Sequence, residues 1–193
     1  MDLTQGTIEE KNDRAKRMML WFGIASMVMS FAGLTSAVLV SRKRDDWLEN
    51  FAMPEGFLIS CIIIVLSSIT FIVAKRAIQA NNRSLTTVML LITFGLGIAF
   101  IFSQLNGFNE IIANGYNFTG PTSNVTMSFI YVIAAVHILH VIAGLISIIV
   151  VIYNHFKQKY NSENTLGIRL SATFWHFVDI LWLFLFVFLA YLV

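Results

Sequence analysis

Five long runs of apolar residues, separated by shorter polar stretches, dominate the order of residues along this chain. About 20 apolar residues in a helix cross the hydrocarbon core of a bilayer. Lipid offers no partners to backbone N–H and C=O groups, so each run must be helical. The pattern predicts an all-α membrane protein with a polar tail at 1–17 and a single transmembrane domain at 18–193. Its five helices are expected at about 18–40, 56–74, 85–103, 127–153 and 171–193.

The composition agrees with a membrane protein and excludes several other classes. Of 193 residues, 57% are hydrophobic and 12% are charged, whereas soluble domains carry about 25% charged residues. The formal net charge of +2 comes from basic residues scattered over the loops, which does not indicate nucleic-acid binding. The single cysteine, Cys61, lies in an apolar run, so a disulfide within the chain and a CxxC site are excluded.

The distribution of Lys and Arg over the loops predicts the orientation. With five crossings, the tail lies on the same side of the membrane as the second and fourth loops. These three segments carry ten basic residues, four in the tail and three in each loop, against three on the other side. Basic residues are enriched in cytoplasmic segments. We therefore expect the N-terminus in the cytoplasm and the C-terminus outside.

The last run carries an imidazole and a carboxyl group inside an otherwise apolar segment. An Asp near the middle of a membrane helix costs roughly 2.5–3.5 kcal/mol on insertion scales, so Asp179 requires an explanation. His176 lies three residues earlier and can hydrogen-bond to it. Trp175 and Trp182 lie four residues before and three residues after the acid, so the four side chains share one face. We expect this face to contact protein rather than lipid.

The fourth run holds two histidines, His137 and His140, three residues apart on one face. Gly144 continues this face one turn on, where the missing side chain lets another helix come close. We expect His176 and Asp179 to hold the fifth helix against this face of the fourth. Small polar residues of the second and third runs are interpreted as simple helix-packing positions.

Membrane histidines raise the question of haem, because paired imidazoles commonly bind one haem. His140 lies 13 residues before Tyr153, or roughly 20 Å from that end of its run. His176 lies five residues from the start of its run, or roughly 8 Å from the same side. Two ligands of one haem should lie at similar depths, so this difference of about 12 Å argues against a haem between them.

Three interpretations of the intramembrane histidines stay open. They are hydrogen-bonded packing residues between helices, contacts to a lipid head group or a partner subunit, or metal or haem ligands. The sequence has no CxxC, no HExxH and no Glu/His cluster that would complete a metal site. It also has no nucleophile at a recognisable turn for Ser/His/Asp catalysis. We therefore favour the first two interpretations over the third, and predict no catalytic, cofactor-binding or metal-binding residue in this chain.

Motifs in the last two runs are specific enough to suggest a family. They are Phe174-Trp175-His176-Phe177-Val178-Asp179, Trp182-Leu183-Phe184-Leu185 and His137-x-x-His140-Val141-x-x-Gly144. The first two resemble the terminal YWHFVD-x-x-WLFL signature of subunit III of haem-copper terminal oxidases. The third is similar to that family's HG-x-HV-x-x-G helix. The resemblance extends from about Arg17 to Val193, which is nearly the whole chain.

The resemblance implies a non-catalytic subunit of a proton-translocating respiratory oxidase of the cytochrome c oxidase type, which reduces O2 to water. In this family subunit III packs beside the catalytic subunit I, which holds the haems and copper. It binds phospholipid and is thought to support oxygen access and proton uptake. Subunit II, a small subunit IV and membrane lipids are the other expected partners, in the bacterial inner membrane. The candidate structural, lipid-contacting or partner-contacting residues are His137, His140, Gly144, Trp175, His176, Asp179 and Trp182.

The chain also departs from the family pattern. The family often has seven helices, so five indicate a short bacterial form. Met27 stands where the family usually has an intramembrane Glu, and Ile138 replaces the Gly after the first His of the fourth run. Two alternatives stay open: a small membrane cytochrome with histidine ligands, and a subunit-III-like accessory protein of a nitric oxide reductase.

Overall fold

The computed structural model describes residues 7–48, 51–118, 120, 124–161 and 164–192. In these ranges every regular element is a helix. Each of the five is long and apolar enough to cross a membrane, so the predicted all-α bundle of five transmembrane helices is confirmed. The helices are α1 (Ile8–Ser41), α2 (Glu55–Gln79), α3 (Arg83–Ala113), α4 (Val125–Phe156) and α5 (Leu166–Leu192).

Helix α1 begins well before the apolar run that predicted it. Thr7 caps the helix: its Oγ1 accepts a hydrogen bond from the Glu10 backbone N–H at 3.3 Å, and the Glu10 carboxylate accepts one from the Thr7 N–H at 2.9 Å. This reciprocal arrangement is a capping box. The described part of the predicted polar tail is therefore mostly a helical extension of α1.

The other helices also extend beyond the predicted runs. Helix α3 continues to Ala113 rather than 103, and α5 begins at Leu166 rather than 171. Apolar composition marks where a helix leaves the hydrocarbon, whereas backbone hydrogen bonding continues into the polar region as long as local residues permit it.

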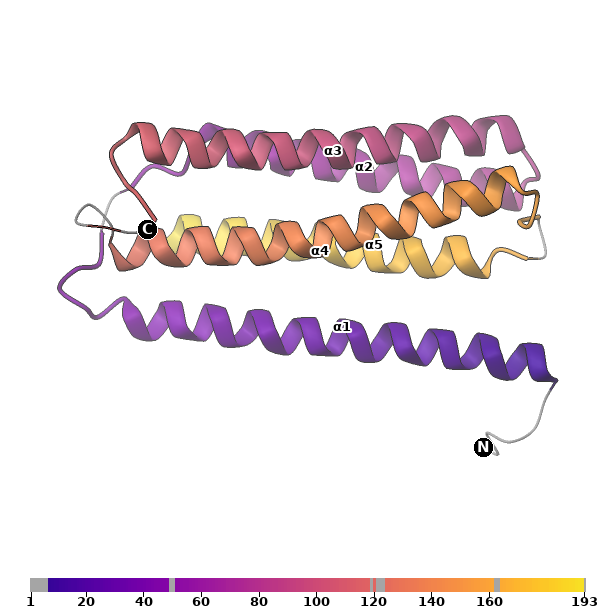
Figure 1. Cartoon of the computed structure of the whole chain (residues 1–193), viewed down its shortest axis with the longest axis horizontal. Helices are drawn as coiled ribbons and strands as arrows, with labels where there is room; N and C mark the ends of the chain where they lie inside the picture. The colour runs from indigo at the N-terminus through magenta and orange to yellow at the C-terminus, as the bar shows by residue number, and fades with distance from the viewer. Residues whose placement is uncertain (1–6, 49–50, 119, 121–123, 162–163, 193) are drawn as a thin grey trace.

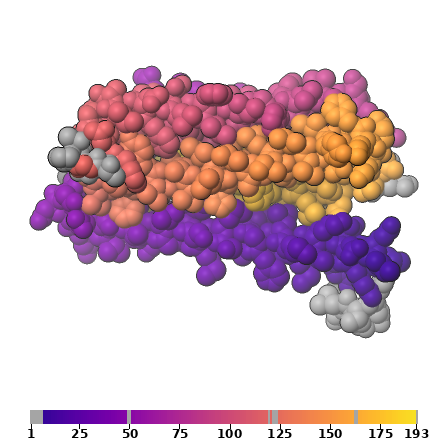
Figure 2. All heavy atoms as spheres, viewed as in Figure 1, coloured from indigo at the N-terminus to yellow at the C-terminus, as the bar shows by residue number. Residues whose placement is uncertain are grey.

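The helices lie roughly along one direction in three rows (Figure 1). Helices α2 and α3 lie side by side along one edge, α4 and α5 occupy the middle, and α1 lies along the other edge. Helix α1 contacts α4 and α5, and its side chains form one whole edge of the molecule in Figure 2. We call the end where α1 starts the N-terminal end; it also carries the α2–α3 and α4–α5 connections.

The core lies where α5 meets its neighbours α2 and α4. The two largest fully buried side chains of the described residues, Trp175 and Trp182, both belong to α5. Their burial inside the bundle agrees with the expectation that this face of the last helix contacts protein.

Helices α2 and α3 cross closely near the other end of the bundle. A Cβ atom placed on Gly56 would lie 2.7 Å from the backbone N of Gly107, and one placed on Gly107 would lie 2.5 Å from the Phe57 ring. The Ser103 hydroxyl donates to the Gly56 carbonyl across this crossing at 2.7 Å. Small residues thus allow backbone approach between membrane helices.

Gly107→Ala is expected to destabilise the bundle by about 1–3 kcal/mol, because the fully buried Phe57 ring cannot move aside without cost. Gly95 lies on the same helix, and a Cβ atom placed on it would have no neighbour within 4 Å. Gly95→Ala is therefore the matched control, and it should gain up to about 1 kcal/mol from helix propensity. Denaturant titration in detergent, followed by circular dichroism, measures both. Equal changes in the two variants would contradict the close crossing.

Candidate functional site

Helix α5 turns its polar face toward α2. The Trp175 indole Nε1 donates to the Ser67 Oγ at 3.0 Å, and the Trp182 Nε1 donates to the Ser60 Oγ at 2.9 Å. The two tryptophans are seven residues apart, as are the two serines, so each pair is separated by about two helical turns. The later tryptophan meets the earlier serine because the helices are antiparallel. We call this contact the α2–α5 seam, formed by Ser60, Ser67, Ser68, Trp175, His176, Asp179 and Trp182.

The Ser60 hydroxyl joins three helices at one atom. Besides the Trp182 indole, its oxygen accepts a hydrogen bond from Gln104 Nε2 of α3 at 2.7 Å. Its proton is donated to the Phe57 carbonyl at 2.7 Å. A hydroxyl has one donor and two lone pairs, so all of them are used. This matters in a membrane, where water cannot satisfy a polar group that loses its partner.

The Trp175 indole lies between glycines of two further helices. A Cβ placed on Gly144 of α4 would lie 2.8 Å from the indole Cε3, and one placed on Gly97 of α3 would lie 2.8 Å from its Cη2. The ring is 1% exposed. Trp175 therefore contacts α2, α3 and α4 from its position on α5. What approaches Gly144 is an indole, and not the backbone of another helix.

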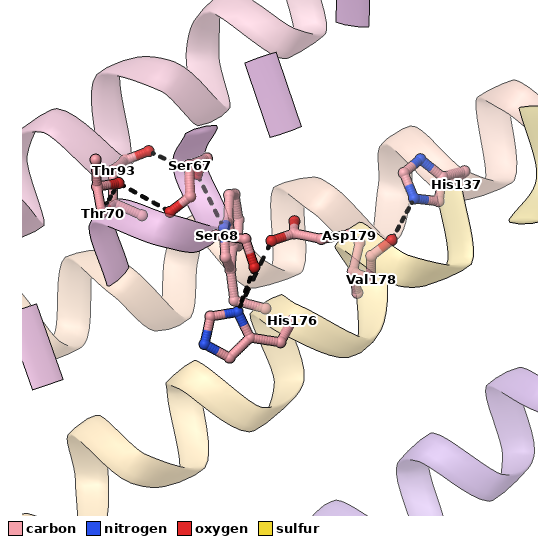
Figure 3. A network of polar contacts seen from close by, with 9 residues as sticks. Ser67, Ser68, Thr70, Thr93, His137, His176, Val178 and Asp179 are labelled. Carbon is pink, nitrogen blue, oxygen red and sulfur yellow. Dashed lines mark hydrogen bonds and ion pairs between the residues drawn. The ribbon is translucent and has the colours of Figure 1, made fainter. Parts of the chain in front are cut away.

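His176 and Asp179 lie beside Ser68 of α2 (Figure 3). The His176 Nδ1 and the Ser68 Oγ are 2.6 Å apart, and the same nitrogen lies 4.0 Å from the Asp179 Oδ2. The Asp179 residue is 2% exposed, and among the described residues neither of its carboxyl oxygens has a hydrogen-bond partner. The His176 side chain keeps 25% of its surface exposed.

His137 connects α4 to α5. It is fully buried, and its Nε2 lies 3.1 Å from the Val178 carbonyl oxygen, so this nitrogen carries the proton and donates. Its ring lies against the Trp182 indole, with centroids 4.9 Å apart. The other ring nitrogen, Nδ1, has no hydrogen-bond partner among the described residues.

His140 faces a different neighbour. Its Nδ1 lies 2.8 Å from the Val136 carbonyl of its own helix, so it donates to the backbone one turn earlier. Its ring centroid is 5.6 Å from that of Phe31 on α1. The two histidines of the fourth run therefore contact different helices, although three residues separate them.

The structure corrects the predicted partner of the His176–Asp179 pair. The spacing predicts that the pair holds α5 against α4, but it lies beside Ser68 of α2. Helix α4 reaches α5 through the His137 contact to a backbone carbonyl and through a hydrogen bond from Ser147 Oγ to Ser171 Oγ at 2.7 Å. The serines of α2 are therefore more than simple packing positions, because their hydroxyl groups are the partners of the α5 side chains.

The predicted difference in depth between His140 and His176 is also wrong. The bond between Ser147 and Ser171 sets the relative heights of α4 and α5. His140 lies seven residues beyond Ser147, and His176 lies five residues beyond Ser171, in the same direction. Their levels therefore differ by about two residues, or roughly 3 Å. The prediction assumes that the two apolar runs end at one height. The two imidazole rings are separated by the direction in which they point, because His140 faces α1 and His176 faces α2.

The chemistry available at the α2–α5 seam is hydrogen bonding between helices, with one buried carboxyl group in addition. The part of the chain that the structure describes contains no group of three or more His, Cys, Asp or Glu side chains that could hold a metal ion. Of the imidazole nitrogens, His137 Nε2 and His140 Nδ1 are already bonded to carbonyls.

Comparison with known proteins decides the family. A family model described as cytochrome c oxidase subunit III matches residues 46–193. The chain belongs to the subunit III family of haem-copper oxidases. The resemblance seen in the motifs of the fourth and fifth helices is thereby confirmed.

Relatives of two oxidase types are similar to this chain. Cytochrome bo(3) ubiquinol oxidase subunit 3 of Pseudomonas aeruginosa is 30% identical over 170 residues, covering 86% of this chain and 79% of that protein. The protein of the same name from Buchnera aphidicola subsp. Schizaphis graminum is 30% identical over 185 residues, with 94% and 96% covered. Cytochrome c oxidase subunit 3 of Bacillus sp. (strain PS3) is 27% identical over 184 residues, with 93% and 86% covered.

Membership in the subunit III family defines the setting of the site. The chain is part of an oxidoreductase complex and associates with other oxidase subunits. Its five spanning helices and its bacterial relatives identify a multi-pass protein of the bacterial inner membrane. The α5 side of the α2–α5 seam consists of Trp175, His176, Asp179 and Trp182, which all belong to the motifs that suggested the family.

Sequence reasoning missed Ser60 and Gly97 as parts of this site. Ser60 could have been found from its spacing, because it precedes Ser67 by the same seven residues that separate the two tryptophans. Gly97 lies on a third helix, and nothing in its local sequence indicates that an indole from α5 lies against it.

Ser60→Ala is expected to destabilise the bundle, because it leaves the Trp182 and Gln104 donors buried without an acceptor. Each unsatisfied donor costs about 1–3 kcal/mol. In the Ser60→Ala background, Trp182→Phe should lower the free energy of unfolding by less than it does in the wild type. The reason is that the two side chains share one hydrogen bond, which Ser60→Ala has already removed. Free energies of unfolding for the two single variants and the double variant measure this coupling.

Ser30→Ala is the control for the Ser60 cycle. Ser30 lies on the exposed face of α1 and donates to the Ser26 carbonyl of its own helix at 3.0 Å. Its replacement should change stability by less than about 0.5 kcal/mol. Strictly additive losses for Ser60→Ala and Trp182→Phe would contradict the shared bond.

Proposed function

We propose that this chain is the non-catalytic subunit III of a proton-translocating respiratory terminal oxidase, which reduces O2 to water with electrons from cytochrome c. The observation that carries the proposal is the family match over residues 46–193. The geometry supports a structural role, because most polar groups of the α5 motif form hydrogen bonds to α2 inside the chain.

The expected partner is the catalytic subunit I, which would hold the haems and copper, together with subunit II and a small subunit IV. The subunit would stabilise subunit I and support the access of oxygen and protons to it. We further propose that the N-terminal end of the bundle faces the cytoplasm. In support, the start of α1 and the α2–α3 and α4–α5 connections gather at this end (Figure 1). Ten of the 13 basic residues lie in these segments or in the adjoining helix ends, at 11–17, 75–83 and 157–169.

Phospholipid binding is also part of the proposal. Two adjoining cavities of about 390 and 710 Å³ lie between the first part of α1 and the facing sides of α4 and α5. The smaller cavity is mainly apolar, with Leu20 and Phe174 among its walls. The larger one is lined by groups of both charges, with Lys16 and Lys159 beside Glu9 and Asp13. An apolar cavity that opens into a polar one with both ammonium and carboxylate groups suits an acyl chain and a zwitterionic phospholipid head group.

A quinol-oxidising complex is the second candidate. Cytochrome bo(3) ubiquinol oxidase subunits match this chain at 30% identity, and a cytochrome c oxidase subunit matches at 27%. The family model, in contrast, is described by the name of cytochrome c oxidase. Both candidates place the site of donor oxidation outside this chain.

Purification of the tagged chain from native membranes in mild detergent tests the main proposal. Haem and copper should arrive with a larger polypeptide and should be lost when the chain is separated from it. The purified complex should consume O2 with reduced cytochrome c. Consumption with quinol alone would move the assignment to the second candidate. Haem that stays on the isolated 21.8 kDa chain would contradict the subunit III role and favour a small cytochrome.

Ala143→Phe is expected to reduce the phospholipid retained by the purified complex, because Ala143 lines the smaller cavity and a phenyl ring would take part of the space that an acyl chain needs. Ala135→Phe is the matched control, on the same helix at an exposed position that does not line either cavity. Phospholipid per complex, measured by native mass spectrometry, decides the outcome. Equal retention in both variants would contradict this lipid site.

A further inference from the structure

The Asp179 carboxyl group lies near the midpoint of α5, 13 residues after Leu166 and 13 before Leu192. It is 2% exposed, and among the described residues neither oxygen has a hydrogen-bond partner. Every other polar side chain of the α2–α5 seam has a partner. An ionisable group inside a membrane span is costly and usually has a function. The subunit role proposed above does not use this carboxyl group.

Charged and titratable groups around the acid do not form a strong ion pair with it. On its own helix, His176 Nδ1 lies 4.0 Å from the Asp179 Oδ2, at the limit of an ion pair. On α2, Lys75 is near enough to interact with His176. On α4, His137 bonds to the backbone carbonyl of Val178 and leaves the carboxyl alone. A carboxylate without a close cation would pay a large desolvation cost here.

A hydroxyl and an imidazole connect the acid to the edge of the seam. The Ser68 hydroxyl faces the carboxyl group (Figure 3) and lies 2.6 Å from the His176 Nδ1. In the tautomer with an unprotonated Nδ1, Ser68 donates to this nitrogen and keeps its lone pairs free to accept from a protonated carboxyl. The His176 side chain keeps 25% of its surface exposed, and Ser68 is also partly exposed, whereas Asp179 is buried.

We propose that Asp179, Ser68 and His176 form a proton-binding site inside the membrane, in which Asp179 holds the proton and His176 is its exchange point. Release begins when the Asp179 carboxyl group turns toward Ser68 and its O–H donates its proton to the Ser68 oxygen. The Ser68 hydroxyl proton passes to the His176 Nδ1, and the His176 Nε2 gives its proton to water that enters from the N-terminal end of the bundle, where Lys75 lies near it. The carboxylate left behind takes up a proton by the reverse route. One proton leaves and one returns, so the resting site is neutral.

The charge-neutral state predicts which replacements the site tolerates. Asn has nearly the shape of a protonated Asp and can donate a hydrogen bond to Ser68, but it cannot release a proton. Asp179→Asn should therefore leave subunit assembly as in the wild type. Were Asp179 a carboxylate paired with an imidazolium, the same change would leave a buried cation and impair assembly.

Infrared difference spectroscopy of the purified complex tests the proposal. The spectrum of the wild type minus that of Asp179→Asn, both near neutral pH, should show the carbonyl stretch of a protonated carboxylic acid. This band should shift in D2O, because the site exchanges its proton. Ser68→Ala should move the band to higher frequency and slow the shift in D2O. Asp45→Asn, an exposed acid in the α1–α2 connection, is the control and should leave the band unchanged.

Each other outcome overturns the proposal. A carboxylate band in place of the carboxylic acid band would show that Asp179 is charged. A carboxylic acid band that never shifts in D2O would show a sealed group with no exchange point. A Ser68→Ala spectrum identical to that of the wild type would remove the hydroxyl from the route. These readouts do not depend on whether cytochrome c or quinol is the electron donor.

Discussion

Two hydrogen bonds from tryptophan indoles to serine hydroxyls, at Trp175–Ser67 and Trp182–Ser60, determine how the last helix sits in this bundle. Membrane helices have no hydrophobic driving force for association, because lipid tails are as apolar as their side chains. Packing and interhelical hydrogen bonds must supply the specificity instead. Since both pairs repeat after seven residues, a slide of α5 by one turn would break both bonds and place two indole N–H groups against apolar surface.

The remaining contacts of the α2–α5 seam depend on this placement. The Trp175 ring requires the space left by the missing side chains of Gly97 and Gly144. Helices α3 and α4 must therefore turn these two glycines toward the ring. The Trp182 ring brings the α4 imidazole of His137 into contact with α5. The seam thus connects four helices and leaves α1 at the edge, in contact with α4 and α5. Such a bundle suits the structural role proposed for this subunit.

The number of helices and the all-α class could be predicted from the sequence, because each crossing of the bilayer requires a run of about 20 apolar residues. Such runs are visible in the order of residues alone. The sequence predicted helix ends poorly, since backbone hydrogen bonding continues past the hydrocarbon, as the capping box at Thr7 shows. Spacing correctly placed Trp175 and Asp179 on one face, but it could not show which helix this face meets. The partner helix depends on the order of helices around the bundle. For this reason the predicted contact of His176 and Asp179 with α4 is wrong, and their neighbour is Ser68 of α2.

An experimental map of the assembled oxidase at side-chain resolution tests the central claim most directly. The account predicts that the Trp175 indole lies between Gly97 and Gly144, with its nitrogen about 3.0 Å from the Ser67 oxygen. The Trp182 nitrogen should lie within hydrogen-bond distance of the Ser60 oxygen. Indoles that turn outward to lipid or to another subunit, with α2 shifted away from α5, would contradict the account.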